Sequence, residues 1–252
     1  MTIFIGGNSH TGALRKAQKR DPDLFPDIHI GPFGSGEFES TAFARTEDGL
    51  VRFTVDAYRA RLIEISGADI FQPGDTWVVM MGTHTARLLA PAFWSNAAPA
   101  RLLQDNPRDK RDFRAVSDRL LAEMIAAGQD NVIAFAQDLR RTGVQVLFAA
   151  CPPLRRSGHV MRAGVHEDVA LFVDRLARQQ FMTRLEALEI PFVTPPPETI
   201  DADGFMAETF AKRFRIDGQR DPHHANPEYG RLMLERVAAK LAELGLRETG
   251  KA

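Results

Sequence analysis

Two polar segments near opposite ends of this 252-residue chain carry the side-chain types that nucleophilic catalysis needs. Residues 6–12 read GGNSHTG after a short apolar run, so Ser9 is expected in a tight turn that opens a helix. Residues 221–227 read DPHHANP, and an aspartate three residues before a histidine can accept from the imidazole Nδ1–H. The other ring nitrogen is then free to take a proton from a serine. Ser9, His224 and Asp221 are therefore candidates for nucleophile, base and orienting acid.

Each of these residues also has an ordinary interpretation. Ser9 could simply be a helix N-cap, which is a common role for serine. The histidines could be solvated residues of a loop. Asp221, His223 and His224 could also bind a metal, but no cysteine joins them and adjacent histidines point apart in most backbone conformations. We therefore expect neither a metal nor another cofactor.

Two further segments could stabilise negative charge on a reacting oxygen. Gly82-Thr83-His84 follows a strongly apolar run, and His84 could donate a hydrogen bond there, although it could equally face solvent at a helix start. Gly34 and Gly36 follow another apolar run and would let the backbone approach a ligand, or they could be plain turn residues.

The pattern of apolar runs and turn residues predicts alternating strands and helices. Strands are expected at residues 2–6, 28–33, 77–81, 144–149 and 190–193. Helices are expected at residues 10–20, 113–127, 130–142, 167–188 and about 226–244, with Asn226 as N-cap and Gly143 just after the third helix. Asp48-Gly49 indicates a turn between two short strands, and residues 104–112 a surface loop.

This order predicts an α/β fold, a three-layer α/β/α sandwich around a mostly parallel sheet, because its central strands are apolar on both faces. In such sheets ligands bind beyond the carboxyl ends of the strands, where the candidate residues fall. We expect residues 1–252 to form one domain. Cys151 follows the strand at 144–149, and no local base would activate its thiol, so a buried apolar role is the better interpretation.

Composition excludes some classes of partner and favours a compartment. Lysine and arginine number 32 against 33 acidic residues, so no net charge attracts nucleic acid or an anionic membrane. The single cysteine suits a reducing compartment, the apolar N-terminal run is too short for a signal peptide, and no stretch approaches a membrane span. We expect a cytoplasmic protein, and the sequence predicts no oligomeric state.

Over residues 2–244 the motifs and their order resemble the SGNH hydrolases, also called the GDSL family of esterases and lipases. The family's first block reads Gly-Asp-Ser, and this chain has Gly7-Asn8-Ser9. The last block reads Asp-x-x-His before a helix, as residues 221–224 do here. The third block, Gly-x-Asn in the family, is Gly82-Thr83-His84 in this chain.

The resemblance implies a flavodoxin-like fold and a role for each candidate residue. Ser9 would be the nucleophile, His224 the base and Asp221 its orienting acid. The oxyanion hole would use the Ser9 N–H, the N–H of Gly34 or Gly36, and His84 in place of the family asparagine. Asn8 and His10 flank the serine and complete the predicted substrate-binding set, with Asn8 expected to support the turn rather than react.

The implied function is a serine hydrolase that cleaves or transfers a small acyl group, with an acyl ester or acylated sugar as its small-molecule partner. The alternatives are a carbohydrate O-acyltransferase, a non-catalytic binding module and a metal-dependent hydrolase. Insertions at 97–112 and 151–166 are expected to shape the pocket. The second is basic and could meet an anionic or sugar substrate, although a solvated loop is the commoner explanation; its basic residues are Arg155, Arg156, His159 and Arg162.

Overall fold

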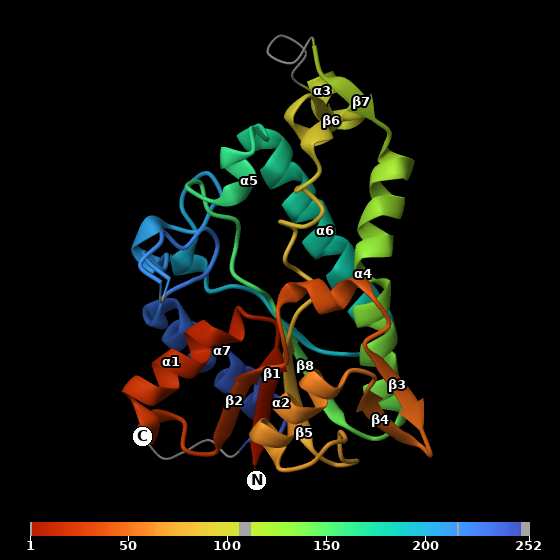
Figure 1. The fold of residues 1–252 in the computed structure, drawn as a ribbon, viewed down its shortest axis with the longest axis vertical. Helices are drawn as coiled ribbons and strands as arrows, with labels where there is room; N and C mark the ends of the chain where they lie inside the picture. The colour runs from red at the N-terminus through yellow and green to blue at the C-terminus, as the bar shows by residue number, and fades with distance from the viewer. Residues whose placement is uncertain (1, 106–111, 216, 248–252) are drawn as a thin grey trace.

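A five-stranded parallel sheet lies between helices in the computed structural model, which describes residues 2–105, 112–215 and 217–247; the sheet occupies the lower half of the view in Figure 1. The strand order is β2-β1-β5-β8-β9. The strands are β1 (Ile3–Gly7), β2 (Ile28–Pro32), β5 (Thr76–Met80), β8 (Gln145–Ala149) and β9 (Phe192–Val193). The predicted strands are thus all present, although the last is shorter than expected. Because every pair is parallel, all carboxyl ends lie at one edge of the sheet.

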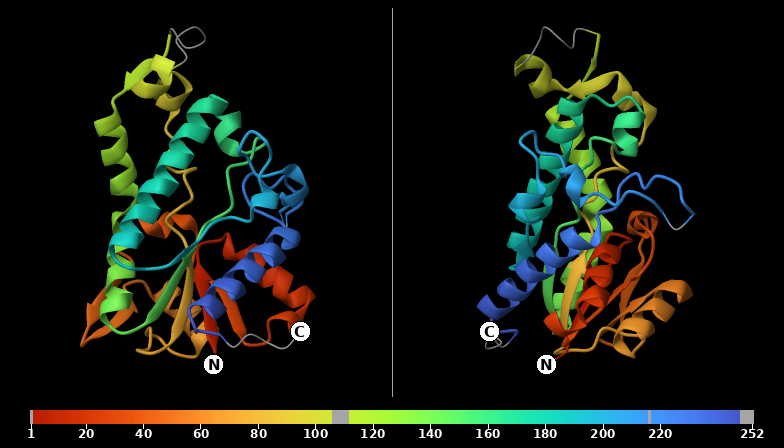
Figure 2. Two further views of the ribbon diagram at one scale, coloured as in Figure 1. Left: turned by 180° about the vertical axis from the view of Figure 1, so that it is seen from behind. Right: turned by 90° about the vertical axis from the view of Figure 1, so that its left-hand side faces the viewer.

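Helices cover both faces, as the sequence predicted (Figures 1 and 2). Side chains along β1 alternate, since Ile3 and Ile5 pack on one side and Phe4 on the other. The first side is covered by α1 (Thr11–Arg20) and α7 (Pro227–Glu243), and the second by α2 (Asp56–Ser66), α4 (Asp118–Arg141) and α6 (Glu167–Ala187). None of the helices in the described segments is long and apolar enough to cross a membrane.

Several boundaries differ from the sequence prediction. The helices expected at 113–127 and 130–142 are wrong as two elements, because α4 continues through Gly128. One glycine in a long amphipathic helix costs only about 1 kcal/mol, which tertiary packing readily offsets. Residues 114–116 form β7 (Arg114–Val116), which pairs with β6 (Ala97–Pro99). Gly143 has a φ of 81° just after the α4 C-cap, as expected for a C′ glycine.

The connections contain more regular structure than the sequence suggested. Helix α2 was not predicted, and its N-cap Val55 makes no side-chain capping bond. The turn at Asp48-Gly49 joins β3 (Ala44–Glu47) to β4 (Leu50–Phe53), as predicted. The predicted insertion at 97–112 begins with β6 and α3 (Ala100–Asp105), so the loop predicted at 104–112 overlaps the end of that helix; residues 106–111 lie outside the described part. The insertion at 151–166 contains the short α5 (His159–Arg162).

Close packing of α1 on α7 sets the position of the two predicted catalytic segments. A Cβ added at Gly230 in α7 would lie 2.2 Å from the carbonyl oxygen of Ala13 in α1, so only glycine permits this approach. Helix α7 begins at its predicted N-cap Asn226, whose side chain accepts from the Tyr229 N–H at 3.1 Å. Since α1 follows Ser9 and α7 follows His224, this contact holds the two segments together.

Candidate active site

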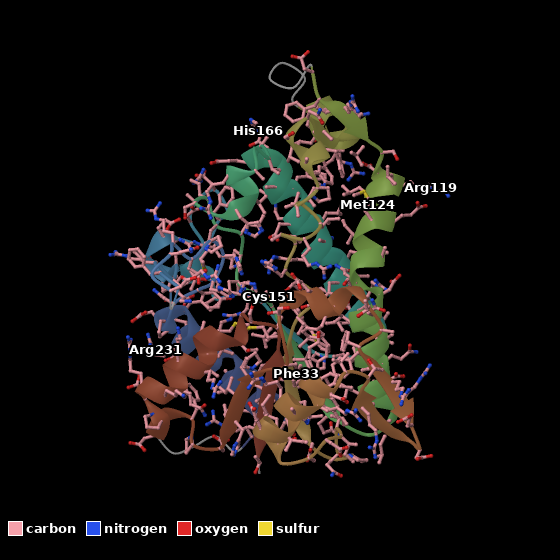
Figure 3. All side chains as sticks on the ribbon, in the orientation of Figure 1. Phe33, Arg119, Met124, Cys151, His166 and Arg231 are labelled. Carbon is pink, nitrogen blue, oxygen red and sulfur yellow. The ribbon has the colours of Figure 1, made fainter. Side chains whose placement is uncertain are left out.

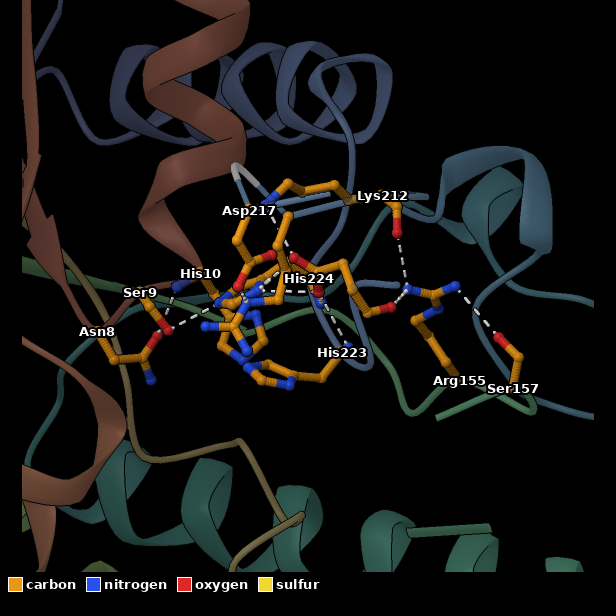
Figure 4. Close-up of polar contacts among 11 residues, drawn as sticks. Asn8, Ser9, His10, Arg155, Ser157, Lys212, Asp217, His223 and His224 are labelled. Atoms are coloured by element: carbon orange, nitrogen blue, oxygen red, sulfur yellow. Dashed lines mark hydrogen bonds and ion pairs between the residues drawn. The ribbon is translucent and has the colours of Figure 1, made fainter. Parts of the chain in front are cut away.

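The side chains of Ser9, His224 and Asp221 form a continuous hydrogen-bonded chain. Figure 4 labels Ser9 and His224 within this network. Ser9 Oγ lies 3.0 Å from His224 Nε2. His224 Nδ1 lies 3.0 Å from each of the two Asp221 carboxylate oxygens. The three residues come from the β1–α1 turn and from the loop before α7, 215 positions apart in sequence between Ser9 and His224. The fold therefore brings together the three residues that the sequence singled out.

The Asp221 side chain has no solvent exposure, yet it is fully engaged. Besides His224 it accepts from Lys212 Nζ at 2.8 Å and from the backbone N–H groups of His223 and His224 at 3.2 and 2.8 Å. Burial acts to raise the pKa of Asp221, but the hydrogen bonds from His224 and Lys212 outweigh it and hold that pKa below its usual range. An ionised carboxylate only accepts, so His224 Nδ1 carries a proton and Nε2 accepts from the Ser9 hydroxyl.

Ser9 is held in the turn by its neighbours rather than by a capping bond. The N-cap position of α1 is His10, which makes no side-chain capping bond, so the N-cap interpretation of Ser9 is wrong. The Asn8 side chain accepts from the His10 N–H at 3.1 Å, and the Thr11 hydroxyl donates to the Asn8 carbonyl at 2.9 Å. These bonds span the serine and leave its hydroxyl directed at His224.

A cavity of about 540 Å³ opens over Ser9. It distinguishes the two candidate glycines, because Gly36 lines it and Gly34 is not among its lining residues. Gly34 instead packs close to the ring of Tyr58, 2.8 Å from where a Cβ would stand. In the described part of the chain, neither the Ser9 nor the Gly36 backbone N–H has a hydrogen-bond partner.

Five of the seven histidines gather around this cavity. The rings of His10 and His84 lie 4.4 Å apart, those of His223 and His224 4.1 Å, and those of His159 and His223 5.4 Å. The sequence named each of these residues, but from separate segments and for separate reasons. Their convergence could not be read from spacing, because it depends on how four loops meet at the sheet edge.

The histidines next to His224 are held neutral at neutral pH. Burial, together with repulsion from His223 and other neighbours, lowers the pKa of His84 to about 3. Burial and the nearby His224 lower the pKa of His223 to about 4. Burial, together with repulsion from the surrounding histidines, also places the pKa of His10 well below its usual value. A neutral imidazole still has one N–H, so His84 can donate a hydrogen bond into the cavity without carrying charge.

One group of side chains in the described residues has the spacing of a metal site, and it overlaps the hydrogen-bonded chain. The ligand atoms of Asp221, His223 and His224 lie within 4.8 Å of one another. The expectation that the adjacent histidines point apart is wrong, because the loop turns between them and their rings lie 4.1 Å apart. However, both ring nitrogens of His224 already contact Asp221 and Ser9, so a metal there would displace one of those contacts.

Cys151 lies at the centre of the molecule, beyond the end of β8 (Figure 3). It is fully buried, and burial together with nearby Glu39 raises the pKa of its thiol to about 11. The thiol is therefore protonated at neutral pH, and the predicted burial is confirmed, but its surroundings are not wholly apolar, because Asn8 Nδ2 donates to Cys151 Sγ at 3.4 Å.

The basic segment after Cys151 is not a solvated loop throughout. Arg155 is only 8% exposed and donates to the Asp221 carbonyl at 2.7 Å, so it braces the loop that carries the carboxylate. Arg156 lies over the ring of Phe205 at 4.5 Å, and of the segment's basic residues His159 reaches the cavity.

Comparison with known proteins finds similarity in structure alone. No family model matches the chain, and no curated protein matches it in sequence. Solved structures do match. A proposed acylhydrolase from Bacteroides fragilis superposes with a TM-score of 0.53 and 11% identity, over 98% of this chain and 88% of the other. A GDSL-like lipase from Bacteroides thetaiotaomicron gives a TM-score of 0.52 and 12% identity, over 96% and 88%.

These matches establish the fold. At 11 and 12% identity they show a common architecture over nearly the whole chain. The chain has the α/β/α fold of GDSL-type hydrolases, which confirms at the level of fold the resemblance drawn from the motifs. The roles of individual residues depend on the geometry described above.

Proposed function

We propose that this protein is a serine hydrolase that cleaves or transfers a small acyl group, with Ser9 as nucleophile, His224 as general base and Asp221 as orienting acid. The observation that carries the proposal is the unbroken chain from Ser9 Oγ through His224 to a buried, ionised Asp221, with Ser9 and His224 lining a cavity. The GDSL-type fold of the neighbours agrees with this chemistry.

The reaction follows from the proton positions. Ser9 Oγ attacks the ester carbonyl while His224 Nε2 takes the hydroxyl proton, and Asp221 stabilises the imidazolium that forms. His224 then returns that proton to the alcohol oxygen as its bond to the carbonyl carbon breaks. The alcohol departs and the acyl group stays on Ser9. Water, or a sugar hydroxyl in a transfer reaction, attacks the acyl-enzyme and restores the serine.

Three donors are available for the oxyanion of the tetrahedral intermediate. Ser9, Gly36 and His84 all line the cavity. Within the described residues the backbone N–H groups of Ser9 and Gly36 have no hydrogen-bond partner, and the imidazole N–H of His84 would be the third donor. We assign the glycine role to Gly36 rather than Gly34 because Gly36 lines the cavity. The imidazole of His84 takes the role that an asparagine amide has in the family, and it does so as a neutral donor.

The test combines covalent labelling with turnover. We expect a fluorophosphonate to label Ser9 and the protein to hydrolyse p-nitrophenyl acetate, with both lost in Ser9→Ala and the turnover lost in His224→Ala. Ser35→Ala is the matched control, because Ser35 also lines the cavity but its hydroxyl makes no hydrogen bond to His224 in the described structure. Full turnover by Ser9→Ala would overturn the proposal.

The remaining outcomes separate the alternatives. A folded protein that is neither labelled nor active would favour a non-catalytic binding module on the same fold. Activity that survives Ser9→Ala but is lost to a chelator would favour a metal held by Asp221, His223 and His224. Product analysis with an added sugar acceptor would distinguish transfer from hydrolysis.

A further inference from the structure

A buried carboxylate that the proposed reaction does not use lies beside the Ser9 turn. Glu39 is 8% exposed and belongs to the short 3-10 helix Gly36–Ser40 that follows β2. Its Oε1 accepts from Asn8 Nδ2 at 2.7 Å, and its Oε2 accepts from the Gly82 N–H at 3.0 Å. Its backbone carbonyl accepts from Asn131 Nδ2 at 3.1 Å, which ties this segment to α4.

The bond to Asn8 fixes the turn that carries the nucleophile. Asn8 is 1% exposed, and both ends of its amide are engaged: Nδ2 donates to Glu39 and, at 3.4 Å, to Cys151 Sγ, while Oδ1 accepts from the His10 N–H. An amide is the group that suits this place. An aspartate at position 8, as in the family's first block, would set two carboxylates about 2.7 Å apart, where they could not both ionise.

The bond to Gly82 fixes the segment that carries His84. Gly82 has a φ of 80°, a conformation that favours glycine, and a Cβ there would lie 2.4 Å from the ring of Phe181. His84 follows two residues later and lines the cavity. The Glu39 carboxylate therefore accepts from the N–H of Gly82, a position where a residue larger than glycine would not fit.

Two of the three donor segments proposed for the oxyanion thus meet at the Glu39 side chain, and the third belongs to the same short helix as Glu39. The Ser9 turn is reached through Asn8, the His84 segment through Gly82, and Gly36 stands three residues before Glu39 in the same short helix. We propose that Glu39 is a positioning residue that aligns these segments, and that its pairing with Asn8 replaces the charged side chain of the family's first block. This inference rests on the proposed function, and it assigns Glu39 no contact with substrate.

The expected effect follows from how sensitive acyl transfer is to geometry. A displacement of about 1 Å at a reacting group costs on the order of 100-fold in rate. Glu39→Gln keeps the shape but places an amide donor against either Asn8 Nδ2 or the Gly82 N–H. We expect kcat to fall about 10- to 100-fold while KM changes little, because the aligned donors act mainly in the transition state.

Exchanging the two groups supplies the decisive test. Asn8→Asp alone should also lower kcat, and its loss should grow as pH rises and both carboxylates are driven to ionise. In the double variant N8D/E39Q, the amide at position 39 donates to the carboxylate at position 8 and accepts from the Gly82 N–H. The hydrogen bond between positions 8 and 39 and the bonds to the N–H groups of His10 and Gly82 are then all made, with the charge moved to position 8, so kcat should recover to within about 5-fold of wild type.

The control is Thr199→Val, because Thr199 is fully buried and its hydroxyl donates a 2.6 Å hydrogen bond to the Pro196 carbonyl, outside this network. It should change the unfolding midpoint without changing kcat. The inference would be overturned if kcat of both single variants lay within 3-fold of wild type, or if kcat of the double variant were no higher than that of either single variant. Neither result would count against the proposed serine hydrolase activity.

A second measurement covers the case in which wild type shows no Ser9-dependent turnover, so that the proposed function itself fails. In amide NMR spectra, Glu39→Gln should then shift the resonances of Ser9, Gly82 and His84 and speed hydrogen exchange at these three amides. Thr199→Val should leave them unchanged. Unchanged amides at all three positions would refute the positioning role whatever the protein's activity.

Discussion

Replacing His84 separates the donor role of its imidazole from its packing role. His84→Phe keeps an aromatic ring at its 4.4 Å contact with His10 but removes the N–H. His84→Asn introduces the side chain that the SGNH hydrolases, which this chain resembles, have in their third block. If the imidazole donates to the oxyanion, the asparagine variant should retain much of the rate and the phenylalanine variant should not.

The magnitude follows from the charge state of the ring. Loss of one oxyanion donor typically costs about 10²–10³ in kcat. The pKa of His84 is about 3, so the donor is neutral and the lower end applies, near 10². The missing contact forms mainly with the transition state, so KM should change by less than about 3-fold.

The assay is the pH dependence of p-nitrophenyl acetate hydrolysis between pH 5 and 9. His84 stays neutral over this range, so the ratio of the wild-type kcat to the His84→Phe kcat should not vary with pH. His159→Phe is the control, because His159 lines the same cavity but has no assigned part in the reaction. The donor role would be refuted if kcat of His84→Phe lay within 3-fold of wild type, or if His84→Asn were as slow as His84→Phe.

Three other predictions concern the acid, the buried imidazoles and the helix contact. Asp221→Asn should lower kcat about 10⁴-fold, because an amide no longer selects the His224 tautomer whose Nε2 accepts a proton, and steady-state kinetics would measure it. The imidazoles of low pKa around His224 bind protons in the unfolded chain below pH 6.5 but not in the folded one, so folding stability should fall as pH drops from 6.5 towards 4. Urea unfolding should show a slope of up to about 1.4 kcal/mol per pH unit for each such histidine, and a flat profile would contradict it. Gly230→Ala should lower the free energy of unfolding by about 1–3 kcal/mol, measured by denaturant titration, because its Cβ would meet the Ala13 carbonyl oxygen.

The sequence predicted the sheet well because its central strands are buried on both faces. Runs such as residues 77–81 are apolar throughout, which leaves little choice of element. Helix boundaries were less accessible. Gly128 suggested a break in α4 that packing overrides, and α2 begins without a capping side chain. Short strands such as β7 depend on a partner strand, which a local pattern does not contain.

The residues of the candidate site also differ in how far the sequence could predict them. Ser9, Asp221 and His224 could be predicted because each belongs to a local motif with a chemical reason for its spacing. Glu39 could not, because it lies in no motif and nothing local shows that it is buried. Asn8 stands where the family has aspartate, but only the folded structure shows that its amide pairs with this carboxylate.

The low pKa values of the surrounding imidazoles favour the role that we propose for His224. In the proposed reaction His224 must become positively charged, and each neighbouring ring that was already charged would oppose that step. Burial keeps His10, His84 and His223 neutral, while the ionised Asp221 lies 3.0 Å from His224 Nδ1. Among the histidines that meet at this cavity, His224 is therefore the one placed to accept the serine proton, because it alone contacts both the Ser9 hydroxyl and a carboxylate in the described structure.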